Sequence, residues 1–181
     1  MMEKVRADFQ RWCVSQALNR KIRRGNSEPI SSHGCWENIQ TCLVIWPGDG
    51  LDVTAGELIL KRLHERFKDA RLNVIALPGI GALTTTDIPY DKMQLNEQDF
   101  NFMGLPRKSA VIRLQDLRGD ITIDLSPDFN PHSAYLSILS GAKLLIGFSD
   151  QIQQSPYNFQ VAPNQSSQGI DRYKVLAQYI G

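Results

Sequence analysis

The most constraining feature of the chain lies between residues 41 and 150, where two segments each read as strand, loop, helix and strand. The first segment covers residues 41–78 and the second covers residues 120–150. Their strands are continuous apolar runs, the pattern of strands buried on both faces. Strands that alternate with helices in this way form a parallel sheet with helices on both sides. We therefore predict an α/β fold, a three-layer Rossmann-like single domain with a mostly parallel sheet.

The predicted elements follow from apolar periodicity and from turn residues. Strands are expected at residues 41–46, 72–77, 92–96, 121–126 and 143–148, with an edge strand at 157–162. Helices are expected at residues 3–23, 54–67, 109–117, 131–140 and 169–180. Right-handed crossovers then give the strand order third, second, first, fourth, fifth. This divides the chain into an N-terminal helix (1–24), a loop (25–40) and a Rossmann-like domain (41–181).

Composition narrows the class of protein. With 181 residues, the chain is large enough for one domain with a core and too short for two doubly wound domains. A net charge of +1 creates no field that would attract nucleic acid, so no nucleic-acid partner is expected. The apolar runs are shorter than the ~20 residues of a membrane span, and the N-terminus lacks a signal-peptide block. Together with thiols that suit a reducing compartment, this predicts a cytoplasmic protein.

Neither a metal site nor a cofactor site is expected. The chain has three cysteines and three histidines, without metal-ligand spacing. The loop after the first strand contains Gly48 and Gly50 but lacks the spacing of dinucleotide-binding or phosphate-binding loops. Asp49 between these glycines would also repel a phosphate.

Residues 1–24 carry seven basic and two acidic side chains, a charge of +5, which leaves −4 for the remainder. Apolar residues recur there at helical spacing. The helix either packs on the domain or lies on an anionic membrane surface with Phe9 and Trp12 inserted. We expect docking on the domain, with Phe9 and Trp12 buried, and at most a weak membrane contact.

Candidate site residues follow from the predicted topology. Ligands of such sheets bind beyond the carboxyl ends of the strands, at the point where the strand order reverses. This point of reversal, the switch point, lies between the strands that begin at Thr41 and Ile121. Asp52, next to a helix, is the candidate general base. The expected ligand-binding cleft is formed by Gly48, Asp49, Gly50, Ser126, Asp128, Asn130 and His132.

Residues 41–180 also resemble the N-terminal half of the family 9 glycosyltransferases, the ADP-heptose:lipopolysaccharide heptosyltransferase type. The resemblance rests on motifs in matching order: Leu43-Val-Ile, the six-residue loop ending in Asp52, Asp69-Ala-Arg-Leu-Asn-Val-Ile, Asp120-Ile-Thr-Ile-Asp124-Leu, Leu139-Ser-Gly-Ala-Lys143, and Asp171 to Gly181. It implies an acceptor-binding domain in which Asp52 occupies the position of the catalytic base, without the domain that holds the nucleotide sugar.

Two functions are compatible with these observations. The first is a single-domain protein that is non-catalytic alone and binds a ligand or a protein partner, including a second copy, at the switch-point cleft. The alternative is the acceptor-binding half of a glycosyltransferase, which would take a saccharide or lipid-linked acceptor and need a separate donor-binding chain. Because this alternative places the donor site on another chain, the purified chain alone should neither hydrolyse a nucleotide sugar nor transfer from it.

Overall fold

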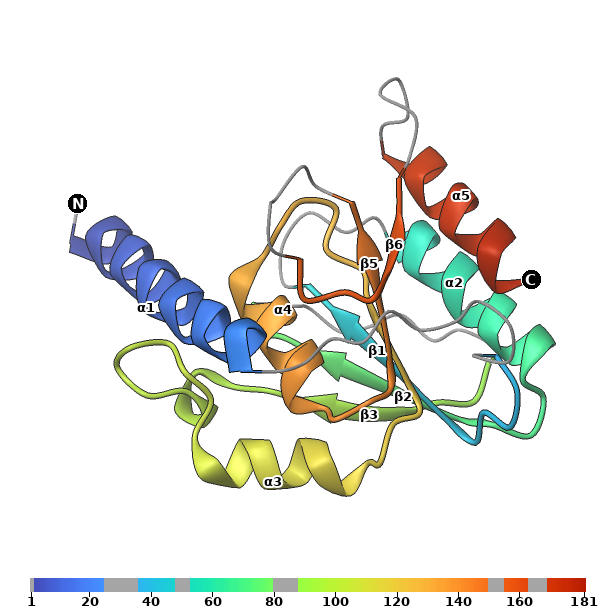
Figure 1. Ribbon diagram of the computed structural model, residues 1–181, viewed down its shortest axis with the longest axis horizontal. Helices are drawn as coiled ribbons and strands as arrows, with labels where there is room; N and C mark the ends of the chain where they lie inside the picture. Colours follow the sequence, from blue (N-terminus) through green and yellow to red (C-terminus); the bar gives the residue numbers. More distant parts are fainter. Residues whose placement is uncertain (1, 25–35, 48–52, 80–87, 150–154, 163–168) are drawn as a thin grey trace.

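The described part of the chain forms a six-stranded sheet in which each strand is parallel to its neighbours (Figure 1). The structure, a computed structural model, describes residues 2–24, 36–47, 53–79, 88–149, 155–162 and 169–181. The strands are β1 (Thr41–Trp46), β2 (Arg71–Ala76), β3 (Asp91–Gln94), β4 (Ile121–Asp124), β5 (Leu144–Phe148) and β6 (Phe159–Val161). The helices are α1 (Met2–Arg24), α2 (Val53–Arg66), α3 (Lys108–Asp116), α4 (Pro131–Leu139) and α5 (Ile170–Ile180), with a 3-10 turn η1 (Glu97–Asp99).

The strand order is β3-β2-β1-β4-β5-β6. This confirms the predicted α/β class, the parallel pairing and the order of the first five strands. The predicted edge strand is present as β6, which pairs with β5. Strand β1 lies between β2 and β4, so the reversal of strand order falls at β1 and β4, as the sequence predicts.

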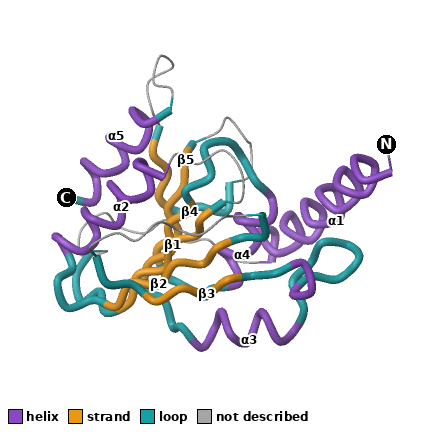
Figure 2. The backbone as a smooth tube through the Cα atoms, turned by 180° about the vertical axis from the view of Figure 1, so that it is seen from behind, coloured by secondary structure: helices purple, strands orange, loops and turns teal. Residues whose placement is uncertain are grey.

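Helices cover both faces of the sheet and complete the three layers. Figures 1 and 2 show α2 and α5 on one side, and α1, α3 and α4 on the other. The two layers have separate apolar cores, one against α2 and α5 and one against α3 and α4. No described residue of α1 belongs to these two cores, and the helix packs on α4.

Strand β1 shows how one apolar run supplies both cores. Successive side chains of a strand point to opposite faces. Cys42, Val44 and Trp46 therefore pack toward α2 and α5, whereas Leu43 and Ile45 pack toward α3 and α4. All five side chains are buried. A continuous apolar run is the sequence signature of this arrangement.

Helix α1 forms over the predicted segment, but one expectation about it is wrong. It docks through Val14 and Leu18, which are buried, with Leu18 in the cluster formed with α4. Phe9 and Trp12, expected to be buried, are 46% and 60% exposed. At ~100° per residue these two residues face roughly opposite to Val14 and Leu18. Periodicity identified the helix but did not identify which of its two apolar stripes packs inward.

Within the described residues, we find no helix whose length and apolar character would allow it to cross a membrane.

Candidate functional site

The switch point predicted from the sequence is only partly described by the structure. The loop that follows β1 carries Gly48, Asp49, Gly50 and the candidate base Asp52, and all four lie outside the described residues. The loop that follows β4 is described and carries Ser126, Asp128 and Asn130, and His132 lies in the first turn of α4. They separate into two pairs. Asn130 and His132 line a groove, whereas Ser126 and Asp128 are not among its lining residues.

Ser126 belongs to a buried polar cluster at the carboxyl end of β4. Its hydroxyl oxygen lies 2.7 Å from that of Ser133 on α4, and its backbone N–H donates to Asp124 Oδ1 at 2.9 Å. The hydroxyl of Tyr157 donates to Asp124 Oδ2 at 2.5 Å. These bonds tie the end of β4 to α4 and to the segment that enters β6.

Asp124 is the buried acid of this cluster and was not among the candidates. Its side chain is 1% exposed. Burial raises the pKa of Asp124 above its usual value, while hydrogen bonds from Ser126, Tyr157 and Ser133 oppose that rise. The only feature of the sequence that could have identified Asp124 is its position as an acidic residue at the end of an apolar strand. Because Asp124 is enclosed, its role here is to organise the loop that follows β4.

Asp128 has a structural contact on the exposed side of the same loop. Its side chain is 94% exposed, with Oδ1 3.6 Å from an Nη1 of Arg172 on α5. Arg172 also donates to the carbonyl of Pro127 and lies over the ring of Phe148, 5.3 Å from its centroid. Arg172 thus links the loop after β4 to α5, and this contact lies on the opposite side of the sheet from α1.

The groove that contains Asn130 and His132 lies between α1 and residues 97–107, and we name it the α1 groove. Its volume is about 920 Å³. It adjoins the carboxyl ends of β2 and β4, on either side of β1, through Leu77 and Pro78 after β2 and through Asn130 after β4. The full lining is Glu3, Arg6, Ala7, Gln10, Leu77, Pro78, Glu97, Gln98, Phe100, Asn101, Phe102, Gly104, Arg107, Asn130 and His132.

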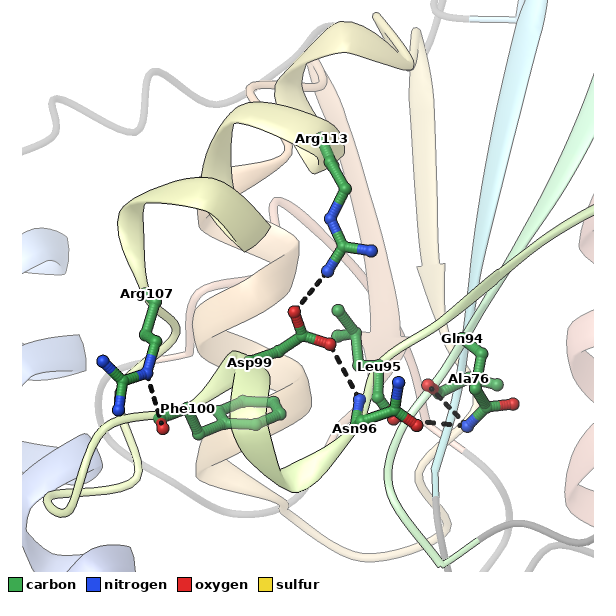
Figure 3. A network of polar contacts seen from close by, with 8 residues as sticks. All are labelled: Ala76, Gln94, Leu95, Asn96, Asp99, Phe100, Arg107 and Arg113. Carbon is green, nitrogen blue, oxygen red and sulfur yellow. Dashed lines mark hydrogen bonds and ion pairs between the residues drawn. The ribbon is translucent and has the colours of Figure 1, made fainter.

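One wall of the α1 groove is a compact loop whose polar contacts are shown in Figure 3. The carboxylate of Asp99 pairs with Arg113 on α3 and accepts the backbone N–H of Asn96 at 2.9 Å. The Arg107 guanidinium donates to the carbonyl of Phe100 at 3.2 Å, and its backbone N–H donates to that of Asp99 at 2.7 Å. Asp99 therefore anchors this wall to α3.

The tip of the same loop is a turn held by Asn101. Its side-chain oxygen accepts the backbone N–H groups of Met103 and Leu105, at 2.9 and 3.1 Å. Phe100 and Pro106 form an antiparallel bridge at the base of the turn. The ring of Phe102 at the tip is 71% exposed. The wall thus presents an exposed aromatic ring on a rigid turn.

Helix α1 forms the opposite wall and is tied to the loop. Gln10 donates to the carbonyl of Phe102, and Arg11 donates to that of Phe129, both at 3.3 Å. Gly104, in the turn of the loop, has a φ of +76°. A Cβ there would lie 2.9 Å from His132 Nε2 and 3.0 Å from Gln10 Cβ, so a glycine is required both by conformation and by space.

His132 forms part of the floor of the groove. Its backbone N–H donates at 3.0 Å to the side chain of Asn130, which caps α4, and its ring lies edge-to-face on Phe100 at 6.4 Å. Burial, and secondarily the positive charge of Arg11, lower the pKa of His132 below its usual value. The ring is therefore neutral at pH 7 and offers one donor and one acceptor.

Sequence reasoning missed most of the α1 groove. Arg6 and Gln10 lie more than eighty residues from Gln98 and Arg107 in the chain, and no local pattern links the two segments. Asn101 and Gly104 are residue types that favour turns, but residue type does not indicate which segment a turn contacts. Among the described residues, no group of three or more His, Cys, Asp or Glu side chains could hold a metal ion.

The described residues form an α/β domain of Rossmann-like topology with an open, polar and aromatic groove at the carboxyl edge of its sheet. The chain matches no protein-family model, and no curated protein matches it either.

Proposed function

We propose that the chain is a binding module whose α1 groove takes a small polyhydroxylated ligand of the saccharide class, and that the isolated chain does not transform this ligand. The proposal rests on one observation: the two walls of the α1 groove together present an aromatic ring, guanidinium groups and an amide. One wall offers the exposed aromatic ring of Phe102 and the guanidinium of Arg107, and the other offers Arg6 and Gln10.

The chemistry of the lining supports a saccharide. Hydroxyl groups accept and donate hydrogen bonds, and the groove offers amides, guanidinium groups and a neutral imidazole that match them. The volume of about 920 Å³ is within the range of small-molecule sites. The lining contains two arginines, Arg6 and Arg107, and two acids, Glu3 and Glu97, so the groove has no excess of one charge that would select a highly charged ligand.

The test is a titration of the protein with free mono- and disaccharides, in which NMR chemical shifts of the backbone amides are monitored. Shifts should appear at Gln10, Phe102 and His132 by about 10 mM sugar, a concentration that nearly saturates a site with a Kd near 1 mM. Arg6→Gln should weaken the binding, and Arg20→Gln, on α1 but outside the lining, should not. No shift at these residues with any sugar would contradict the proposal.

A second candidate is the acceptor-binding half of a glycosyltransferase, favoured by the position of the groove at the switch-point edge, where the resemblance places the acceptor. The isolated chain should then bind a saccharide acceptor and leave nucleotide sugars intact. Turnover by the chain alone, lost in Asp52→Ala, would contradict the binding-module proposal and assign catalysis to this chain.

A further inference from the structure

Helix α1 has a second apolar stripe that is not used in docking. Val5, Phe9 and Trp12 are 64%, 46% and 60% exposed. Their spacing of four and three residues places them within about 60° of one another on the helix surface. The rings of Phe9 and Trp12 lie 6.4 Å apart. This outward stripe faces roughly away from Val14 and Leu18, the residues that hold the helix on the domain.

The stripe is concentrated where the helix is least supported. Residues 3–9 are exposed, and Figure 1 shows this end of α1 extending beyond the sheet. Three of the seven exposed large apolar residues in the described part of the chain belong to the outward stripe. Exposed large apolar groups gathered on one face indicate a binding surface rather than scattered exposure.

Charge identifies the occupant that fits this surface. The segment 1–24 carries +5, whereas the rest of the chain carries −4. Arg20 and Arg23 are exposed further along the helix, within about 60° of the stripe. Aromatic side chains followed by arginines along the same helix face suit the boundary between lipid headgroups and acyl chains. A second copy of the chain fits less well, because it would bring two segments of +5 together.

We propose that α1 rests on an anionic lipid surface through Val5, Phe9 and Trp12 while Val14 and Leu18 hold the domain on the opposite side of the helix. Docking and membrane contact exclude each other for a helix with a single apolar face. The structure makes them compatible, because the two stripes point in different directions. Three residues are a small anchor, so the contact should be weak, reversible and dependent on salt.

The experiment is flotation of the full chain with vesicles of phosphatidylcholine alone and with vesicles that contain phosphatidylglycerol at about 30 mol %. The protein should bind only the anionic vesicles, at about 0.05 M salt, and should largely dissociate at about 0.5 M, where the Debye length is a few ångströms. The double variant Phe9→Ser with Trp12→Ser should lower the partition coefficient about tenfold, equivalent to 1.4 kcal/mol.

The matched control is Val53→Ser with Ile112→Ser, which removes two apolar residues of similar exposure, 42% and 47%, elsewhere on the surface. The control should bind anionic vesicles like the unchanged chain. Both double variants should keep the melting temperature, since all four side chains are exposed. Equal binding to uncharged vesicles, or equal losses in both variants, would overturn the proposal.

Two other outcomes would assign the outward stripe to a different occupant. Self-association in sedimentation that disappears in the Phe9→Ser, Trp12→Ser variant, without vesicle binding, would assign it to a second copy of the chain. Binding to polyglutamate without binding to anionic vesicles would assign it to an acidic protein. Either result overturns the lipid proposal, and neither depends on whether the α1 groove binds a saccharide.

Discussion

The phenolic oxygen of Tyr157 lies 2.5 Å from Oδ2 of Asp124, which joins the segment entering the edge strand β6 to the end of the central strand β4. The tyrosine ring lies across Gly147 of β5, where a Cβ would be 2.5 Å from its Cε2. A glycine on the intervening strand therefore provides the space in which the tyrosine reaches the acid. The pair connects three strands at the edge of the sheet where the loop after β4 begins.

Removing the hydroxyl should destabilise the fold. Tyr157→Phe leaves one oxygen of a buried carboxyl without its donor, and such a loss costs about 1–3 kcal/mol. Tyr179→Phe is the control, because Tyr179 is 56% exposed and should change the free energy of unfolding by less than about 0.5 kcal/mol. Urea unfolding monitored by circular dichroism measures both. Equal values for the two variants would show that the bond to Asp124 contributes little.

The raised pKa of Asp124 should appear as a pH dependence of stability. Burial favours the protonated form in the folded state. The resulting stability is fully present below the unfolded-state pKa, near 3.8, and is lost as the pH rises through the higher folded-state pKa. The free energy of unfolding of the unchanged chain, minus that of Asp124→Asn, should therefore fall as the pH rises above about 4. Other titrating groups cancel in this difference, and a constant difference would contradict the raised pKa.

Gly104→Ala should loosen the contact between α1 and the loop that faces it. The φ of +76° alone should cost about 1–2 kcal/mol for a residue with a Cβ, and the close approach to His132 and Gln10 should add to this cost. Gly141→Ala is the matched control, since its φ is +73° but its Cβ would meet no atom within 4 Å. Gly104→Ala should also speed amide hydrogen exchange in α1. If Gly104→Ala and Gly141→Ala have the same stability and the same exchange rates, His132 and Gln10 move to accommodate the added methyl group at no cost.

Asn73→Leu should stabilise the protein. The Asn73 side chain on β2 is 1% exposed, and neither its oxygen nor its nitrogen has a hydrogen-bond partner among the described residues. Replacing it with an apolar group of similar size should raise the free energy of unfolding by about 1–2 kcal/mol. Thr122→Val should have the opposite sign, because Thr122 Oγ1 is bonded to Ser140 Oγ at 2.8 Å. Chemical denaturation of both variants measures these changes, and a destabilised Asn73→Leu would indicate that the Asn73 amide makes a hydrogen bond in the folded protein.

The central strands of the sheet were predictable because each of them is a largely apolar run, whereas β3 (Asp91–Gln94) is polar and carries no such signal. Leu43-Val-Ile45 is apolar on both faces, and the alternation of such runs with helices leaves few arrangements that obey right-handed crossover. The candidate site was less predictable. Asn130 and His132 were identified from their place after β4, since the carboxyl ends of parallel strands share an edge. Arg6 and Arg107 were not, because their proximity depends on how α1 docks.

The sequence by itself determined the α/β class, the parallel order of the first five strands and the presence of a helix over residues 3–23. The helix and the strands follow from local periodicity, which indicates which side chains are buried. The strand order follows from the right-handed crossover rule. Only the tertiary structure decided that Val14 and Leu18 dock the helix while Phe9 and Trp12 remain exposed, and that Gln10 meets the turn at Phe102. Both apolar stripes have helical spacing, so the choice between them rests on the shape of α4 and of the loop opposite, which exists only once the chain has folded.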